Sequence, residues 1–215
     1  MQYDWQSITS LAYTTLIQLD FPAFPVPHNK IKCDGIKIHS YQKYARLTGL
    51  TIKEITCDHE LDDAFLLGGI RPGISLILYN KEKPDARVKH TLWHEIGHVK
   101  CGHKKHGDKE EIEAHFFASQ ANAPNVLIKA IADRGYMVNN TDFLKQCFGL
   151  SESSAQKKLD YLRRYQFEHS NEYDDILLSM FSDFINSKYP PQTALFYGDY
   201  LDEVERDRER WNRYG

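Results

Sequence analysis

The sequence has few cysteines, no long apolar run and no excess of basic residues. Four cysteines occur in 215 residues and none forms a C-x-x-C pair, which excludes a disulfide scaffold and favours free thiols in a reducing compartment. No stretch is long and apolar enough to cross a bilayer, and the first ten residues lack the basic start and apolar core of a secretory signal. We therefore expect a cytoplasmic protein that has no membrane partner.

The balance of charges argues against a general nucleic-acid binder. Lys and Arg number 27 against 30 Asp and Glu, which gives a formal net charge of -3, whereas phosphate backbones are bound by clustered basic side chains. No direct contact with nucleic acid is expected. Apolar residues make up 41% of the chain, so we expect a folded core rather than global disorder.

Hydrophobic patterns along the chain predict an α+β fold that is mostly helical, with a small sheet before the central helix. An amphipathic helix is expected to begin near Asp4 or Ser7 and to end before Phe21. A helix that starts after Pro84 and stops at Gly102 is expected in the middle of the chain. The other predicted elements are strands at 36–39, 52–56 and 74–79, and helices at 41–48, 109–121, 124–133, 141–148, 152–166 (capped by Ser151), 172–187 and 195–213.

Histidines are concentrated in one part of the chain. Six of the ten lie between residues 90 and 115, and the motif HEIGH, from His94 to His98, is at their centre. A four-residue spacing places both imidazoles on one face of a helix, one turn apart, where both can bind a single zinc ion. Glu95 would then project beside the ion and accept a proton from the attacking water, so it is the expected catalytic base.

The same five-residue pattern also occurs by chance on solvated helices. Here the neighbouring Trp93 and Ile96 are apolar, which indicates that the helix is embedded in the protein. Gly97 has no side chain, so a second helix can approach the metal helix closely. The motif is therefore interpreted as half of a metal site.

A catalytic zinc site needs a third protein ligand and one open position. Lys104 occupies the place of the third histidine in the H-E-x-x-H-x-x-G-x-x-H arrangement, which excludes that arrangement, and His103 lies one residue early. The better candidate is Glu111 in EEIEAHFFA. Ala114 and the residues one turn further along share its side of a helix, so Glu111 can face the metal. His115 would then stand beside it as a hydrogen-bonding partner of the ligands.

The other acidic residues of this segment have a simpler explanation. Glu110 and Glu113 are interpreted as acids that stabilise a helix N-terminus, an alternative that also applies to Glu111. Tyr136 and Tyr161 are candidate donors to the oxyanion of the reaction, although no pattern places either one near the metal.

Taken together, these segments resemble the ImmA/IrrE family of metallopeptidases. The resemblance covers about residues 35–165 and rests on LILYN at 76–80, TLWHEIGH at 91–98, the E-x-x-A-x-x-F-A spacing that starts at Glu111, and FGLSESSAQKKLDYL at 148–162. It departs from the family at His115, where Asn or Asp is usual, and at ANAPNVL (121–127), where a Leu-Leu-Met-Pro-like run is usual. The resemblance implies a zincin-like domain, placed at 1–135, followed by a helical region at 136–215.

The resemblance also implies a function. It suggests a one-zinc endopeptidase that cleaves a helix-turn-helix repressor and thereby derepresses stress or mobile-element genes. The alternatives are a non-catalytic anti-repressor that binds its partner and keeps the metal helix, and a peptidase toxin.

Two charged segments in the carboxyl half have plainer interpretations. Residues 142–164 are predicted to form helix, turn and helix, and the basic side chains of the second helix are interpreted as a solvated face rather than a DNA reader. The tail at 195–213 is interpreted as an exposed helix held by ion pairs. The basic side chains in question are Lys157, Lys158, Arg163 and Arg164.

Overall fold

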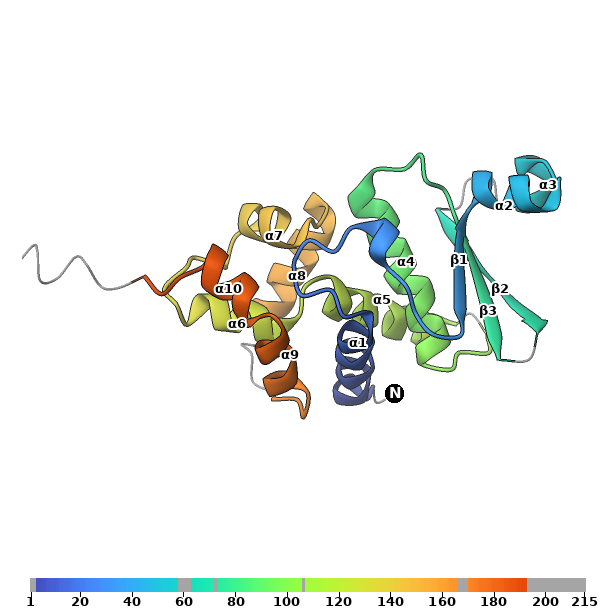
Figure 1. Cartoon of the computed structure of the whole chain (residues 1–215). Coiled ribbons are helices and arrows are strands. Elements are labelled where there is room, and N and C mark those ends of the chain that lie inside the picture. Colours follow the sequence, from blue (N-terminus) through green and yellow to red (C-terminus); the bar gives the residue numbers. More distant parts are fainter. Residues whose placement is uncertain (1–2, 58–62, 72, 106, 166–169, 193–215) are drawn as a thin grey trace, which may run out of the picture.

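The computed structural model describes residues 3–57, 63–71, 73–105, 107–165 and 170–192. Figure 1 shows the small sheet toward one end of the molecule, long helices in the middle and a group of mostly shorter helices at the other end. The predicted α+β class is confirmed, including the sheet that precedes the HEIGH helix.

One helix comes first in the chain, the three strands follow with two short helices between the first and the second, and the remaining helices come last. The strands are β1 (Ile36–Ser40), β2 (Ala64–Arg71) and β3 (Ile74–Tyr79), and a short 3-10 turn, η1, spans His28–Lys30. The α-helices are α1 (Trp5–Leu19), α2 (Tyr41–Thr48), α3 (Ile52–Thr56), α4 (Asp85–Lys100), α5 (Asp108–Asn122), α6 (Asn125–Ala132), α7 (Thr141–Phe148), α8 (Glu152–Tyr165), α9 (Asp174–Met180) and α10 (Ser182–Lys188).

The central strand β3 is buried on both faces, which explains its unbroken apolar sequence. It pairs with β1 in parallel and with β2 in antiparallel orientation. Ile77 faces the main core, whereas Leu76 and Leu78 pack with Tyr41 in a second, smaller cluster. Because side chains alternate along a strand, burial on both sides demands apolar residues at every position. The predicted strand at 74–79 is confirmed.

The strand predicted at 52–56 is wrong, since these residues form α3. Thr51 accepts a hydrogen bond from the backbone N–H of Glu54 at 3.2 Å, and the Glu54 carboxylate accepts one from the backbone N–H of Thr51 at 2.8 Å. This capping box satisfies two terminal donors and so favours a helix over the β-preference of the neighbouring residues. The third strand of the sheet is β2, which the sequence did not predict. Its two adjacent glycines and its irregular register between Leu67 and Arg71 interrupt the alternating pattern by which a strand is recognised.

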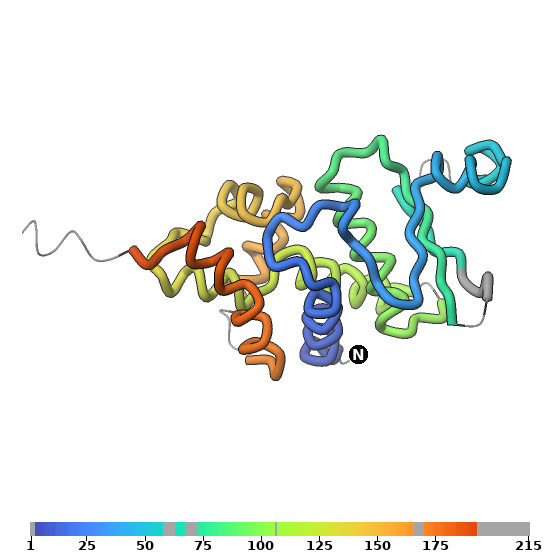
Figure 2. Tube along the Cα trace, viewed as in Figure 1, coloured from blue at the N-terminus to red at the C-terminus, as the bar shows by residue number. Residues whose placement is uncertain are grey.

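One hydrophobic core joins the two halves of the chain. It includes Trp93 of α4, Phe117 of α5 and Phe148 of α7. The tube in Figure 2 follows the chain from the amino-terminal helix α1 to α10, and residues on both sides of position 135 contribute to this core, so the boundary at 135/136 stays a prediction. No helix among the described residues is long and apolar enough to span a membrane.

The carboxyl half departs from the prediction at two points. The helix predicted at 172–187 is interrupted at Phe181, which is fully buried and stacks on Phe24 at 4.9 Å between ring centroids; the break lets this ring and the two short helices face the same core. The tail helix predicted at 195–213 lies outside the described residues.

The helix, turn and helix at 142–164 is confirmed, but its charges are not all solvated. Gly149 ends α7 with a φ of 66°, and the Ser151 hydroxyl accepts a hydrogen bond from the Ser154 N–H at 3.2 Å at the start of α8. Lys158 is only 2% exposed. The prediction of a solvated face is wrong for this residue, because it lies on the same side of α8 as the buried Leu162.

Candidate metal centre

The HEIGH motif lies on α4, a helix that is enclosed by the rest of the protein. Trp93 and Ile96 are fully buried, as the apolar character of the motif predicts, and α4 packs against the sheet on one side and α5 on the other. The two histidines of the motif therefore sit on a rigid support.

Gly97 allows α5 to lie directly against α4. A methyl group at this position would be 3.1 Å from Cβ of Phe117 and 3.2 Å from the carbonyl oxygen of Ala114, both tighter than ordinary van der Waals contact. The predicted close approach of a second helix is confirmed. This approach brings the acidic first turns of α5 to the two histidines of α4.

Three side chains with metal-binding atoms meet where α4 and α5 touch. Nε2 of His94 lies 3.1 Å from Nε2 of His98. The Glu111 carboxylate approaches both rings, with Oε2 at 3.3 Å from Nε2 of His94 and Oε1 at 3.4 Å from Nε2 of His98. The structure thus brings together the three residues that the sequence suggested as ligands.

This group of side chains fits a tetrahedral metal ion. Zinc binds imidazole nitrogen and carboxylate oxygen at about 2.0–2.2 Å, so tetrahedral ligands stand roughly 3.3–3.5 Å apart. The three separations, 3.1 to 3.4 Å, match that spacing closely. His98 is 2% and His94 12% exposed at the side chain, whereas Glu111 is 41% exposed, so the site is sheltered on the α4 side and open to solvent on the α5 side.

Glu95 follows His94 on α4 and is 8% exposed. Successive residues of a helix are turned by about 100°, so its carboxylate does not share the face of the two histidines. A buried carboxylate on the residue next to a proposed ligand is a group that can accept and return a proton, so the role of Glu95 as catalytic base stays a prediction.

The end of α4 holds a further histidine against the site. Gly102, with a φ of 70°, ends the helix in a Schellman arrangement: the His103 N–H donates to the His98 carbonyl at 3.0 Å and the Gly102 N–H to the Val99 carbonyl at 3.1 Å. Gly102 therefore stops the helix as predicted. The turn places the His103 ring beside that of His98, with their Nδ1 atoms 2.9 Å apart.

A hydrogen-bonded chain then runs from His98 to a carboxylate. Nε2 of His103 lies 3.0 Å from the Glu113 carboxylate. If His98 uses Nε2 for the metal, its Nδ1–H donates to Nδ1 of His103, and Nε2–H of His103 donates to Glu113. The structure thus gives Glu113 a role that the sequence reasoning missed when it assigned this residue to the helix dipole.

His115 and His90 line the exposed side of the site. The donor atoms of His94, Glu111 and His115 lie within 4.8 Å of one another, a cluster that could hold a metal ion. The His115 ring is 4.4 Å from that of His94 and 5.6 Å from that of His90. The 90, 94, 98 spacing, one residue per turn of α4, is the sequence signal that could have placed His90 here.

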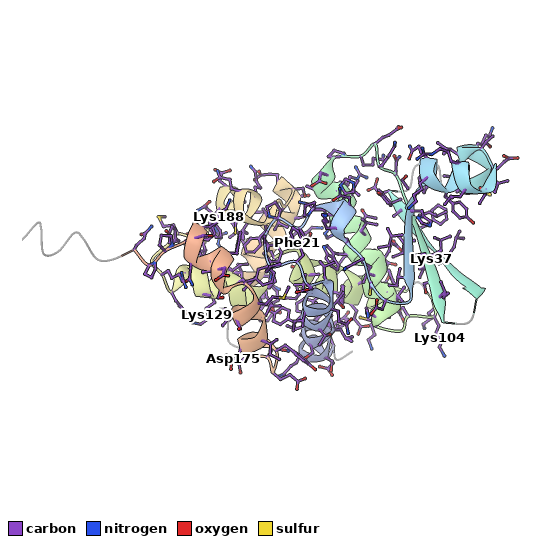
Figure 3. All side chains as sticks on the ribbon, viewed as in Figure 1. Phe21, Lys37, Lys104, Lys129, Asp175 and Lys188 are labelled. Carbon is purple, nitrogen blue, oxygen red and sulfur yellow. The ribbon has the colours of Figure 1, made fainter. Side chains whose placement is uncertain are left out.

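Tyr136 and Lys104 lie away from the metal centre. The hydroxyl of Tyr136 donates to the Pro190 carbonyl at 3.0 Å, so the structure shows it in contact with the carboxyl-terminal segment rather than with α4 or α5. Lys104, at the position of the absent third histidine, is exposed in the loop after α4 (Figure 3).

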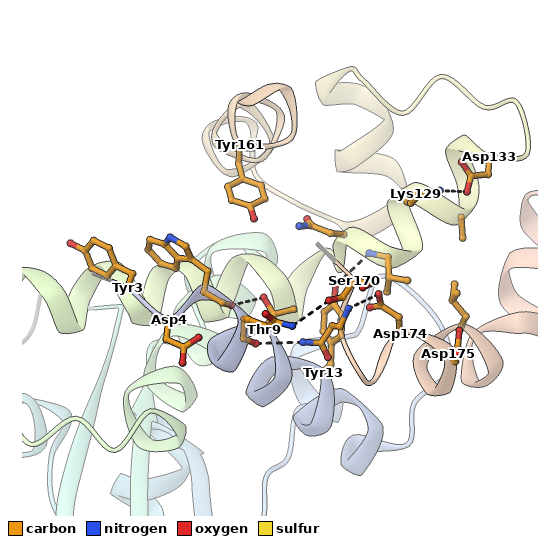
Figure 4. Close-up of a pocket in the computed structure, with 17 residues that line it drawn as sticks. Tyr3, Asp4, Thr9, Tyr13, Lys129, Asp133, Tyr161, Ser170, Asp174 and Asp175 are labelled. Atoms are coloured by element: carbon orange, nitrogen blue, oxygen red, sulfur yellow. Dashed lines mark hydrogen bonds and ion pairs between the residues drawn. The ribbon is translucent and has the colours of Figure 1, made fainter. Parts of the chain in front are cut away.

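A cavity of about 510 Å³ lies away from the metal centre (Figure 4). It lies among α1, α6 and α9, and its carboxylates have local structural roles. Asp4 accepts from the Ser7 N–H at 3.0 Å, and Asp174 accepts from the Asn171 N–H at 2.9 Å; both bonds stabilise the start of a helix. We assign no chemistry to this cavity.

Comparison with known proteins agrees with this geometry. Residues 57–160 match peptidase family M78, described as the IrrE N-terminal-like domain, and this range contains α4, α5 and most of α8. Comparisons with curated proteins and with solved structures gave no match. Residues 57–160 thus form an IrrE N-terminal-like domain, the domain of the ImmA/IrrE family of metallopeptidases.

Proposed function

We propose that the protein is a zinc-dependent endopeptidase that cleaves a helix-turn-helix transcriptional repressor. In this proposal His94, His98 and Glu111 bind one zinc ion and Glu95 is the catalytic base. The observation that supports it most is the meeting of three side chains, His94, His98 and Glu111, whose nitrogen and oxygen atoms lie 3.1 to 3.4 Å apart. The buried Glu95 is next to His94 in the sequence. The repressor as substrate comes from the resemblance to this family, and the free thiols agree with a cytoplasmic location.

The chemistry divides between the ion and the side chains. When bound, zinc would lower the pKa of a water molecule to about 7 and polarise the peptide carbonyl. Glu95 takes the proton from the attacking water and delivers it to the departing amine. Glu111 contributes the negative charge that offsets part of the ion's charge, and its exposed position leaves room for a peptide to enter from the α5 side.

The test uses the repressor encoded beside this protein as the substrate. The zinc-loaded protein and its Glu95→Gln variant are each mixed with the repressor, and intact masses are recorded over time. We expect one discrete cut with the wild type and none with the variant, while both bind one zinc ion. Absence of cleavage with every divalent metal would contradict the proposal. Relief of repression by Glu95→Gln would instead support a non-catalytic anti-repressor.

A further inference from the structure

A second cavity, of about 420 Å³, lies directly beside the candidate metal centre. It is formed by α4, α5 and α8, and its wall includes His90 and His115. The His115 ring is in turn 4.4 Å from that of the proposed ligand His94. Consecutive Cα atoms of a bound peptide are about 3.8 Å apart. If one peptide residue lies at the metal, a side chain that enters this cavity therefore belongs to a residue one or two positions away.

The wall combines apolar surface with an excess of positive charge. Three basic residues, Lys157, Lys158 and Arg164, line it against one acidic residue, Asp160. Asp160 is itself paired with Arg163 at 3.7 Å. Much of the remaining wall is aromatic or aliphatic and includes Trp5, Ile112, Phe116, Leu150, Tyr161 and Tyr165.

The three basic side chains of the wall outnumber its one carboxylate. This excess of positive charge makes the cavity suited to an anionic group.

Lys158 is the most unusual residue of the wall. Its side chain is 2% exposed, and among the described residues its ammonium has no hydrogen-bonding partner. It lies over the Tyr161 ring, at 5.7 Å from the ring centroid. Burial lowers the pKa of Lys158 to about 7. A buried cation without a partner is costly, and a carboxylate is the group that would compensate it.

We infer that this cavity is the subsite for an acidic side chain, Glu or Asp, of the peptide cleaved at the metal centre, and that Lys158 binds its carboxylate. The ammonium is carried on a flexible four-carbon chain, so it can turn from the Tyr161 ring toward a carboxylate in the cavity. The methylene groups of the acidic residue then pack against the aromatic wall. This inference rests on the proposed function and adds a substrate preference to it.

The first test measures the preference directly. A library of peptides from a digested proteome is treated with the zinc-loaded protein, and the cleaved bonds are identified by mass spectrometry. We expect Glu and Asp to be enriched at least fivefold at one fixed position near the cut. Lys158→Met, which keeps the length of the side chain and removes its charge, should continue to cut but lose the enrichment. Arg163→Met, on the same helix and outside the cavity wall, should retain it.

The second test does not depend on cleavage. The zinc-loaded Glu95→Gln protein is titrated with the capped peptides Ala-Glu-Ala and Ala-Gln-Ala and with acetate, and binding is followed by isothermal titration calorimetry. We expect the Glu peptide to bind about tenfold more tightly than the Gln peptide, and Lys158→Met to abolish the difference. If acetate binds as tightly as the Glu peptide, the cavity is a site for free anions and the substrate subsite is rejected.

The two tests separate the two ideas. Binding of the Glu peptide without cleavage of any peptide would support the subsite and count against the peptidase. Cleavage without an acidic preference, or with one that survives Lys158→Met, would support the peptidase and overturn the subsite.

Discussion

The hydrogen-bonded chain from Glu113 through His103 to His98 should control how tightly the site binds zinc. Both bonds have ordinary lengths, 2.9 and 3.0 Å, and are sheltered from water, since the side chains of His103 and Glu113 are 6% and 14% exposed. Such partners fix the tautomer and orientation of a ligand, and their loss typically lowers metal affinity 10- to 100-fold.

The expected size depends on how much of the chain is removed. Glu113→Gln keeps an oxygen acceptor but removes the charge, so we expect a loss of about tenfold, or about 1.4 kcal/mol. His103→Ala removes both bonds and should approach 100-fold, or about 2.7 kcal/mol. Because Glu113 acts through His103, the double variant should bind zinc no more weakly than His103→Ala alone.

The assay is competition for zinc against a chromophoric chelator at fixed pH. Lys109→Met is the matched control, because it removes the other partner of Glu113, 3.4 Å away, and leaves His103 intact. It should change the affinity less than twofold. If His103→Ala keeps wild-type affinity with unchanged circular dichroism, or if the losses simply add in the double variant, the reasoning is refuted.

Three further predictions concern stability. Gly97→Ala should lower the free energy of unfolding by up to about 2 kcal/mol in urea titrations, because overpacking against α5 exceeds the gain of about 1 kcal/mol in helix propensity. The free energy of unfolding of the wild type should increase between pH 7 and 10. The pKa of Lys158 is about 7 in the folded chain and 10.5 in the unfolded chain, so in this range the unfolded chain binds more protons. The increase should vanish in Lys158→Met and persist in Lys157→Met. Chelation of zinc should lower the Tm of the wild type, since the ion binds only the folded state, and should leave the Tm of His94→Ala unchanged.

The meeting of His94, His98 and Glu111 could be predicted from the sequence because it depends on local geometry. The spacing of His94 and His98 determines their common face once a helix is assumed. Glu111 followed from a second helix with small residues at the contact and a glycine opposite them. These relations need only helical periodicity and the rule that small side chains allow helices to approach.

The residues that sequence reasoning missed depend on contacts between distant segments. Glu113 was assigned to the helix dipole because nothing local to its sequence shows that the turn after α4 brings His103 to its carboxylate. Lys158 carries a charge and so suggested an exposed position, yet the apolar stripe of α8 buries it. In α3 the sequence does contain a local helix signal, the capping box of Thr51 and Glu54. The sequence-based prediction gave more weight to the β-branched residues and so predicted a strand.

The most direct test of the central claim is anomalous diffraction from crystals of the zinc-loaded protein, recorded on both sides of the zinc absorption edge. We predict a single strong peak within about 2.0–2.2 Å of Nε2 of His94, Nε2 of His98 and a carboxylate oxygen of Glu111. A peak between His90 and His115 instead, or no peak between α4 and α5, would contradict the account.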